Sequence, residues 1–461
     1  MEATAAVILA AGKGTRMKSD LVKVMHELGG CPMIDYPVSA ARDAGASRIV
    51  IVAGHQSEKV RKYFSDSEDI SFAIQEEQLG TGHAVACAGS ALTGFRGGIL
   101  ILCGDVPLLR AETLRDMMDC HEKSGAAITV LTARFDNPYG YGRVVKGEDG
   151  SVLRIVEEKD AEEAERKIDE INSGIYCVES KFLFDAIARL GNDNAQGEYY
   201  LTDIVRKAAE AGLKCLTFPV GDAMEVMGVN DRVQLAAAGA VVRSRINQAL
   251  MYSGVTIIDP LNTYIDRGVR IGADTVVFPN VHITGLSQIG TNCVIEPSAV
   301  IRGCKLGNRV TVKAGSVMTD SVLHDEVSVG PMAHLRPGTE LMRHVKIGNF
   351  VETKKVVMGE DSKASHLTYL GDAAIGRGVN IGCGTITCNY DGVKKHRTVI
   401  EDEVFVGSDV QLVAPVTVGR NSLIAAGTTV TRDVPPDSLA IARTPQVNKE
   451  GWVKERAKGK G

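Results

Sequence analysis

The segment Leu9–Met17 places two glycines and two basic side chains directly after an apolar run. Gly12 and Gly14 allow backbone N–H groups to approach phosphate oxygens without a Cβ clash, and Lys13 and Arg16 add positive charge. The spacing matches neither the Walker A loop nor the dinucleotide-binding fingerprint, which requires a third glycine. A tight strand-to-helix turn is the alternative, but the crowded charges favour a phosphate-binding loop.

A second group of chemically capable residues lies in the segment Ser365–Asp372 and just beyond it. This segment contains His366 and Tyr369, and Asn380 and Asn389 follow. A histidine ionises near neutral pH, so it is a suitable general base where an amine must lose a proton before attack. A lone histidine is more often a surface or satisfied core residue, but the combination of His, Tyr and Asn side chains favours a site.

Isoleucine, leucine and valine recur every sixth residue through the second half of the chain. A step of six keeps side chains on one face of a strand and scatters them around a helix. This sustained period is typical of hexapeptide repeats and predicts a left-handed parallel β-helix. The register is lost between Ile347 and Val406, so we expect an insert there to hold the site around His366. The repeating positions are Ile271, Val277, Ile283, Ile289, Ile295 and Ile301, then Val329, Leu335, Leu341 and Ile347, and finally Val406, Leu412, Val418, Ile424 and Val430.

The first half of the chain, residues 1–228, alternates short apolar runs with amphipathic stretches. This alternation predicts an α/β Rossmann-like domain with a parallel sheet covered on both faces. Ligands of such sheets bind at the carboxyl ends of the strands, so the glycine-rich loop and the loop after Cys103 should share one crevice. The expected strands are Val7–Ala10, Arg48–Ala53 and Ile99–Cys103, and the expected helices are Met33–Ala44 and Ala84–Leu92.

Three further segments complete the expected organisation. Residues 229–252 carry an apolar stripe at helical spacing and predict a connecting helix. Residues 253–445 form the β-helix domain, with the regular repeats ending near Val434, where two prolines follow. Residues 446–461 form a basic C-terminal arm.

Composition excludes several classes of protein. The net charge of −5 argues against binding nucleic acid by bulk electrostatics. The ten cysteines include no CxxC pair, which favours reduced thiols and a cytoplasmic location over disulfides or zinc. The apolar run Ala5–Ala11 lacks a basic leader and is too short for a membrane span, and no other segment is long enough.

The segment Leu9–Met17, followed by Lys23, resembles sugar-phosphate nucleotidyltransferases. Further motifs of that family occur in the same order across the first half of the chain. These are Gln75, Leu79–Ala84, Gly104–Leu108, Tyr141–Arg143, Glu157, Asn172 and Asn230.

The resemblance implies that a sugar 1-phosphate attacks the α-phosphorus of UTP and that pyrophosphate leaves. Catalysis of this kind depends on alignment and on neutralisation of negative charge, for which Arg16 and Lys23 are expected. Asp105 follows an apolar strand and is expected to hold Mg²⁺, with Asn230 as a second oxygen ligand. The alternatives are a solvated turn for Asp105 and a helix N-cap for Asn230.

The resemblance also assigns binding residues. Ala11, Gly12, Gln75, Gly80 and Thr81 are expected on the uracil and ribose side, and the sugar is expected at three other residues of the set. The full set expected to bind UTP or UDP-N-acetylglucosamine is Leu9, Ala10, Ala11, Gly12, Lys23, Gln75, Gly80, Thr81, Cys103, Gly104, Asp105, Gly142, Glu157, Asn172 and Asn230, of which Gly142, Glu157 and Asn172 hold the sugar.

The segments Leu335–Gly338, Asn349–Lys355, Ser365–Asp372 and Thr387–Gly392 closely resemble one family of bifunctional bacterial enzymes. That family joins an N-acetylglucosamine-1-phosphate uridyltransferase to a glucosamine-1-phosphate acetyltransferase, and the resemblance covers essentially the whole chain. It implies that His366 is the general base, with Glu352 as a candidate to orient it. The amino-sugar phosphate is expected at Arg336, Lys354, Tyr369 and Asn380, and acetyl-CoA at Cys383, Asn389, Tyr390, Ser408, Ala426 and Arg443.

The implied product is UDP-N-acetylglucosamine, a precursor of the bacterial cell wall. The implied assembly is a homotrimer with acetyl-transfer sites between neighbouring β-helices. Two alternatives stay open. A nucleotidyltransferase with a regulatory or assembly-only β-helix predicts no acetyl-CoA turnover, and a non-catalytic scaffold predicts no pyrophosphate release from UTP.

Overall fold

The computed structural model of the chain describes residues 3–12, 14–54 and 57–458. These residues form two compact units, Met1–Val242 and Arg243–Gly461, and Lys13 of the glycine-rich loop lies outside the described residues.

The first unit is built on a mixed sheet with the strand order β11-β7-β10-β6-β1-β4-β5. Its strands are β1 (Thr4–Ala10), β4 (Arg48–Ala53), β5 (Ile70–Ile74), β6 (Gly98–Cys103), β7 (Ile128–Arg134), β10 (Glu170–Glu179) and β11 (Cys215–Pro219), with the hairpin β8 (Gly142–Lys146) and β9 (Val152–Val156) beside β10. The expected strands are present, but the expectation of an all-parallel sheet was wrong. Strand β10 is antiparallel to β6 and β7, because the chain reaches it through the β8–β9 hairpin and not through a long helical crossover.

Helices cover both faces of this sheet and bury two apolar cores. One core contains residues of α1, α2 and α4, and the other contains residues of α3, α6 and α7. The helices are α1 (Asp35–Asp43), α2 (Ser57–Tyr63), α3 (Thr81–Cys87), α4 (Ala111–Ser124), α5 (Glu163–Arg166), α6 (Ser180–Ile187) and α7 (Asp203–Glu210). The helix expected at 84–92 is therefore shorter, and the separate 3₁₀ turn η3 (Ser90–Leu92) follows it.

The expected connecting helix is α8 (Arg232–Tyr252). The apolar stripe of this helix is packed against the protein, since Ala238 and Val242 are buried. Ile246 and Leu250 pack against the core of the second unit. No helix in the described part of the chain combines the length and apolar character needed to cross a membrane.

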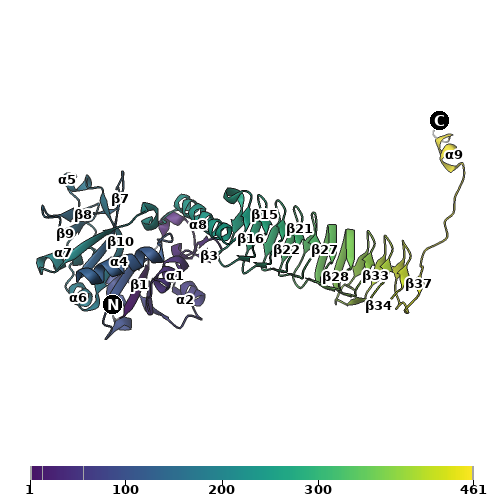
Figure 1. Cartoon of the computed structure of the whole chain (residues 1–461), viewed down its shortest axis with the longest axis horizontal. Helices are drawn as coiled ribbons and strands as arrows, with labels where there is room; N and C mark the ends of the chain where they lie inside the picture. Colours follow the sequence, from purple (N-terminus) through teal and green to yellow (C-terminus); the bar gives the residue numbers. More distant parts are fainter. Residues whose placement is uncertain (1–2, 13, 55–56, 459–461) are drawn as a thin grey trace. The chain divides into compact units, whose positions relative to one another are not determined.

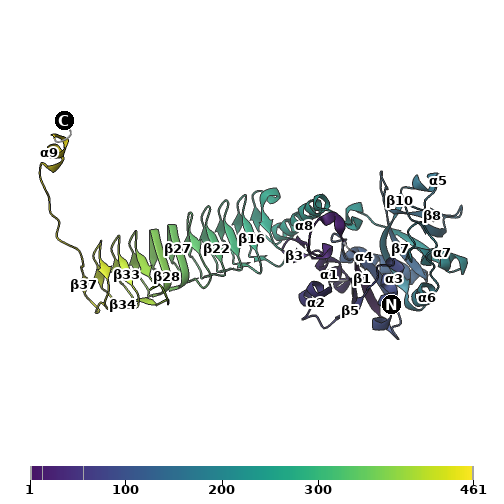
Figure 2. The same cartoon turned by 180° about the vertical axis from the view of Figure 1, so that it is seen from behind.

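The second unit is a parallel β-helix of short strands from β12 (Thr256–Ile257) to β37 (Leu439–Ala440), stacked coil on coil (Figures 1 and 2). Each strand generally pairs with the third strand further along, as β14 (Arg270–Ile271) does with β17 (Gln288–Ile289). The apolar residue of every expected hexad is buried in one continuous core. Before Val329 the register slips at two steps of five residues, from Ile301 to Leu306 and from Met318 to Leu323.

The expected insert between Ile347 and Val406 is much smaller than the hexads indicated. The long strands β27 (Lys346–Met358) and β28 (Lys363–Ile375) pair in register without a break, so His366 lies on a strand, next to the coil corner at Leu367, and not in an insert. The pattern was obscured because Thr353 takes an inward position, in register with Leu335 and Leu370. The true insertion is the loop 389–397, between β30 (Ile386–Cys388) and β31 (Thr398–Ile400).

The β-helix also continues past the two prolines that were expected to end its regular repeats. Val434 is buried and bridges to Val418, and β37 pairs with β35 (Leu423–Ile424) beyond them. The basic arm that follows ends in α9 (Trp452–Lys458). All ten cysteines are free thiols, as expected.

Candidate active sites

Four residues expected to act on phosphate meet at the carboxyl end of the central strands of the first unit. Lys23 Nζ donates a hydrogen bond to the Asp105 carboxylate and another, of 3.1 Å, to Asn230 Oδ1. Arg16 Nη2 donates to the same Asn230 oxygen at 3.0 Å. Arg16 lies on the 3₁₀ turn η1 (Thr15–Met17) and Lys23 on η2 (Lys23–Met25). Asp105 follows β6 and Asn230 precedes α8, so the tertiary fold joins four separate segments here.

The glycine-rich loop is shaped by this arrangement. Gly14 has φ of +60°, and a Cβ there would lie 2.6 Å from Lys23 Cβ. Any larger residue would therefore combine backbone strain with a clash against Lys23.

The oxygens of Asp105 and Asn230 fit a hard divalent cation. The Lys23 ammonium already lies between them and contacts both, so the two oxygens converge on one positive charge. The described residues hold no cluster of three His, Cys, Asp or Glu side chains, but Mg²⁺ needs only one or two carboxylates when phosphates and water complete its shell. The alternative role of Asn230 as a helix cap was wrong, because Asp231 caps α8 by accepting from Gln234 N at 2.8 Å.

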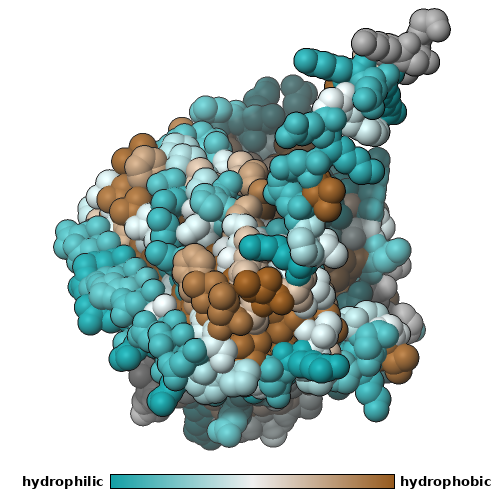
Figure 3. Space-filling model, turned by 90° about the vertical axis from the view of Figure 1, so that its right-hand side faces the viewer, coloured by the Kyte–Doolittle hydropathy of each residue, from teal (hydrophilic) through white to brown (hydrophobic). Residues whose placement is uncertain are grey.

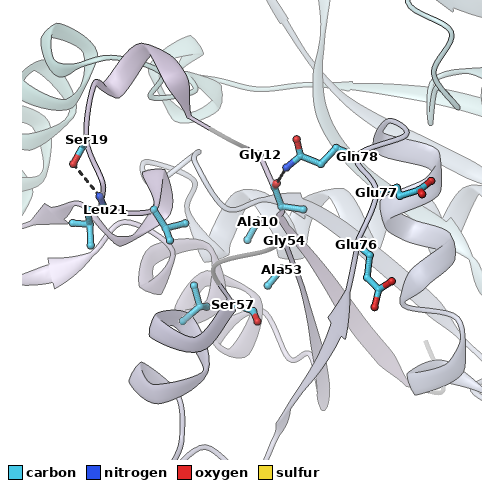
Figure 4. A pocket seen from close by; sticks show the side chains of 13 residues that line it. Ala10, Gly12, Ser19, Leu21, Ala53, Gly54, Ser57, Glu76, Glu77 and Gln78 are labelled. Carbon is cyan, nitrogen blue, oxygen red and sulfur yellow. Dashed lines mark hydrogen bonds between the residues drawn. The ribbon is translucent and has the colours of Figure 1, made fainter.

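A cavity of about 520 Å³ opens beside this cluster, at the ends of β1 and β4 (Figure 4). Ala10, Ala11 and Gly12, which were expected to contact the nucleotide, line this cavity. Gly54 faces them, and a Cβ on it would lie 2.9 Å from Ala11 O. Gln78, which the motifs did not single out, donates its side-chain amide to Ala11 O across the cavity.

The other residues expected on the nucleotide side are held internally. Gln75 is buried, and its Nε2 donates to Gly80 O at 3.0 Å and lies 3.2 Å from His83 Nδ1. Thr81 Oγ1 accepts from Leu201 N at 3.0 Å. These side chains therefore shape the loop that begins α3.

Three residues expected to hold the sugar converge on one face of the sheet. A Cβ on Gly142 would lie 3.5 Å from both Asn172 Cβ and Glu157 Oε2. Burial raises the pKa of Glu157, against the opposing effect of a 3.1 Å hydrogen bond from Thr202 Oγ1. Cys103 lies nearby against Gly174, and burial raises the pKa of its thiol to about 12, so it is an unreactive packing group.

In the second unit, His366 has a defined partner that sequence reasoning missed. His366 Nδ1 and Asn349 Oδ1 are 2.8 Å apart, because β27 and β28 place these two residues in register. The expected orienting role of Glu352 was wrong, since its Oε1 accepts from Arg336 Nη1 at 2.9 Å. Glu352 is in register with Tyr369 and not with His366.

A cluster of positively charged side chains lies further along the coils that hold Asn349 and His366. Arg336 and Lys354 were expected there, and Lys395 of the loop 389–397 joins them. The Lys395 ammonium lowers the pKa of Lys354, with desolvation and Arg336 acting in the same direction and Asp372 opposing them. Lys395 and Asp372 line a neighbouring cavity of about 320 Å³. The three cations outnumber the two carboxylates beside them, Glu352 and Asp372, and this excess of positive charge favours an anion.

The residues expected to bind acetyl-CoA fall into two groups. Cys383, Ser408 and Ala426 form a column on successive coils, shown by Asp409 N donating to Cys383 O at 2.7 Å and Gly427 N to Ser408 O at 2.9 Å. The column starts beside His366, since Gly384 N donates to Leu367 O at 3.0 Å. Arg443 extends it by donating to Ala426 O.

Asn389 and Tyr390 belong to the other group, on the loop 389–397. Asn389 Nδ2 donates to Asp372 Oδ2 at 2.5 Å, and Asp372 forms the next corner of the coil after Leu367. Tyr369 lies on the strand between these corners with its hydroxyl over Gly371. Asn380 is on β29 (Asn380–Ile381), in register with Lys363.

Comparison with known proteins agrees with this division of the chain. The family described as Nucleotidyl transferase matches residues 5–223. Residues 288–320 match the hexapeptide repeat of succinyl-transferase, and 397–432 match the bacterial transferase hexapeptide. The expected α/β nucleotidyltransferase domain followed by a left-handed hexapeptide β-helix is therefore confirmed.

Full-length relatives share one name, Bifunctional protein GlmU. The protein from Geotalea uraniireducens (strain Rf4) is 73% identical over 452 residues, which cover 98% of this chain and 99% of the relative. Those from Geobacter metallireducens and Geobacter sulfurreducens are 68% and 65% identical, with 98% of this chain covered in both cases and 99% and 98% of the relatives. The chain, with its two transferase units, belongs to the GlmU family of bifunctional enzymes.

Proposed function

We propose that the chain makes UDP-N-acetylglucosamine in two steps on two separate sites. The second unit transfers an acetyl group from acetyl-CoA to glucosamine 1-phosphate, and the first transfers UMP from UTP to the product with release of pyrophosphate. One observation carries the proposal: a phosphate site around Lys23 and Asp105 and a histidine site around His366 lie in separate units of one chain that is matched along its whole length by bifunctional relatives.

The uridylyl site needs to align two phosphates and neutralise their charge. Arg16 and Lys23 supply two cations beside the glycine-rich loop, and Lys23 is placed to exchange its bonds with Asp105 and Asn230 for bonds to phosphate oxygens. Asp105 and Asn230 would hold Mg²⁺, which supplies charge neutralisation at the triphosphate when bound. Gly142, Glu157 and Asn172 surround the position of the sugar.

The acetyl site needs a base that can take a proton from the ammonium of the amino sugar. With Nδ1–H of His366 donating to Asn349 Oδ1, Nε2 is the unprotonated nitrogen that accepts this proton. The freed amine then attacks the thioester carbonyl, and Ser408 in the adjacent column is a candidate donor to the developing oxyanion.

Loss of the Asn349 contact should slow acetyl transfer. We expect Asn349→Ala to lower kcat for acetyl transfer by about tenfold, because the hydrogen bond that sets the histidine tautomer and orientation is lost. Steady-state measurement of free CoA thiol checks this. Asn349→Asp, which keeps an acceptor oxygen, is the matched control and should retain more activity; equal losses in both variants would contradict the orienting role.

Arg336, Lys354 and Lys395 would bind the phosphate of the amino sugar. We expect Lys395→Met to raise KM for glucosamine 1-phosphate by about tenfold at neutral pH, as loss of a charged hydrogen bond predicts. Lys395 lowers the pKa of Lys354, so its removal raises that pKa again. The pH at which KM begins to rise on the alkaline side should therefore move upward in the variant.

The matched control for this experiment is Lys394→Met, which removes a neighbouring cation of the same loop. This variant should change neither KM for glucosamine 1-phosphate nor the pH at which that KM begins to rise on the alkaline side. If the pH at which KM begins to rise were the same in Lys395→Met as in the unaltered chain, Lys395 would have no effect on the pKa of Lys354.

A homotrimer would complete the acetyl site, because the two groups of acetyl-CoA residues lie at different corners of one β-helix. Three bulky apolar side chains, Met332, Phe350 and Leu367, stack at the His366 corner with positive φ and are 55%, 58% and 58% exposed. Such residues are rarely held in the left-handed region, and an exposed apolar ladder suits contact with another copy. Apolar side chains are also exposed where the β-helix ends, among them Leu439 and Ile441 (Figure 3).

The decisive experiment incubates the purified chain with glucosamine 1-phosphate, acetyl-CoA, UTP and Mg²⁺ and assays free thiol and pyrophosphate separately. We expect both products, with pyrophosphate dependent on prior acetyl transfer. Pyrophosphate from added N-acetylglucosamine 1-phosphate without any thiol release would instead identify a nucleotidyltransferase with a non-catalytic β-helix. Absence of both products would reject the proposal.

A further inference from the structure

The guanidinium of Arg143 is buried at the edge of the first unit's sheet, with 2% of its side chain exposed. Its Nη2 donates to Glu158 Oε2 at 2.7 Å, and its Nη1 donates to Tyr141 O. Its Nε has no hydrogen-bond partner among the described residues. Burying a charge with an unused donor is unfavourable, so apolar packing alone does not explain an arginine at this position.

The Glu158 carboxylate closes a clamp around a short loop. Besides Arg143, its Oε2 accepts from Gly140 N at 3.1 Å. Partial desolvation opposes the effect, but these two hydrogen bonds hold the pKa of Glu158 below its usual value, so it is an anion at neutral pH. Glu158 thereby ties the loop before β8 to the end of β9.

The clamp lies directly behind the residues that surround the sugar. Gly142 precedes Arg143 and is in register with Asn172, and Glu157 precedes Glu158. Neighbouring residues of a strand point to opposite faces, so Arg143 is anchored on the face behind Gly142. Two of the three expected sugar contacts are thus next in sequence to a member of the ion pair.

The same clamp also holds a tyrosine that faces the phosphate cluster. Arg143 binds the carbonyl of Tyr141, whose ring packs edge-on against Phe135 at 5.2 Å between centroids. Burial raises the pKa of Tyr141, and the nearby Asp105 carboxylate adds to this effect. The clamp therefore fixes the backbone on both sides of Gly142, through Arg143 itself and through the carbonyl of Tyr141.

We propose that Arg143 and Glu158 are a positioning pair that sets the affinity of the uridylyltransferase site for its sugar phosphate. The pair acts through the loop 139–142 and through Glu157, and touches no substrate itself. This inference rests on the proposed uridylyl transfer from UTP to N-acetylglucosamine 1-phosphate.

The test measures KM for each substrate separately in Glu158→Gln, Glu158→Leu and Arg143→Lys. We expect Glu158→Leu and Arg143→Lys to raise KM for N-acetylglucosamine 1-phosphate about tenfold, as loss of a charge-assisted hydrogen bond predicts. Glu158→Gln keeps an acceptor and should give a smaller rise. KM for UTP and the rate of acetyl transfer should change by less than about twofold, because no residue of the clamp lines the cavity beside Ala11 and the acetyl site is built from residues of the other unit.

The matched control is Asp169→Asn, which removes the exposed ion pair of Arg134 and Asp169, 2.9 Å apart in the same unit. It should leave both KM values unchanged. The double variant Arg143→Lys, Glu158→Leu should raise KM by less than the product of the two single effects, because both changes break the contact that Arg143 and Glu158 share.

Equal rises in KM for UTP and for the sugar phosphate, or additive effects in the double variant, would show a general loss of structure and overturn the inference. Unchanged KM values in Glu158→Leu would overturn it as well. Failure of the proposed function would look different, since the unaltered chain would then release no pyrophosphate from UTP and N-acetylglucosamine 1-phosphate.

Discussion

Replacement of His366 by alanine should stop acetyl transfer and leave uridylyl transfer intact. We expect kcat for release of CoA to fall by about 10²–10⁴-fold, the usual contribution of a positioned general base. The amino group of glucosamine 1-phosphate is protonated near neutral pH, and an ammonium has no lone pair with which to attack a thioester. His366 is the group held ready for that proton, with Nδ1 fixed by Asn349 at 2.8 Å.

The measurement is a pair of assays on the same preparation of His366→Ala. Free thiol is followed with glucosamine 1-phosphate and acetyl-CoA, and pyrophosphate is followed with UTP and N-acetylglucosamine 1-phosphate. His324→Ala is the matched control, because His324 is another outward histidine of the β-helix and pairs with Glu340, at 2.9 Å. A comparable loss of acetyl transfer in the control, or loss of pyrophosphate release in His366→Ala, would falsify the assignment.

Replacement of Asp105 by alanine should have the opposite effect. We expect uridylyl transfer to fall by about 10³-fold or more, since stabilisation of charge at a phosphoryl group by a held cation contributes several kcal/mol and about 1.4 kcal/mol corresponds to tenfold. The carboxylate of Asp105 is the negative charge that faces Lys23 and Asn230, and its loss leaves the amide oxygen of Asn230 as the remaining ligand.

Acetyl transfer by Asp105→Ala should stay within about twofold of the unaltered chain, because the acetyl site shares no residue with the phosphate site and belongs to the other unit. Asp69→Asn is a suitable control, since it also removes a carboxylate from an ion pair in the first unit, with Arg42 Nε at 2.6 Å. It should retain uridylyl transfer. Loss of both reactions in folded Asp105→Ala would contradict the picture of two separate sites.

Much of the phosphate site was predictable from the sequence because its motifs are local. The glycines of the loop, Lys23 and Asp105 each follow an apolar strand or a turn signal, and parallel strands of an α/β sheet bring their carboxyl ends to one edge. The predicted meeting of Arg16, Lys23, Asp105 and Asn230 is what the hydrogen bonds show. The hexads were predictive for the same kind of reason, since the positions that they marked are all filled by apolar residues of one continuous core.

The partner of His366 could not be read from the sequence. Asn349 meets His366 because one coil of the β-helix stacks on the next, and the length of that coil decides which residues are in register. Thr353 at an inward position hid the continuity of the coils, and Glu352, which carries a charge, was the more obvious candidate by residue type. Lys395 was missed because its loop brings it back to Lys354 from a distant part of the sequence.

The sequence by itself therefore determined the two architectures and the loops that carry chemistry, because periodicity and glycine placement reflect local burial and local backbone geometry. The tertiary structure decided the direction of β10, the pairing of His366 with Asn349 and of Arg336 with Glu352, and the clamp between Arg143 and Glu158. These features depend on the register between strands and on the path by which each loop comes back to the strands. Neither the register nor the loop path produces a periodic pattern in the sequence.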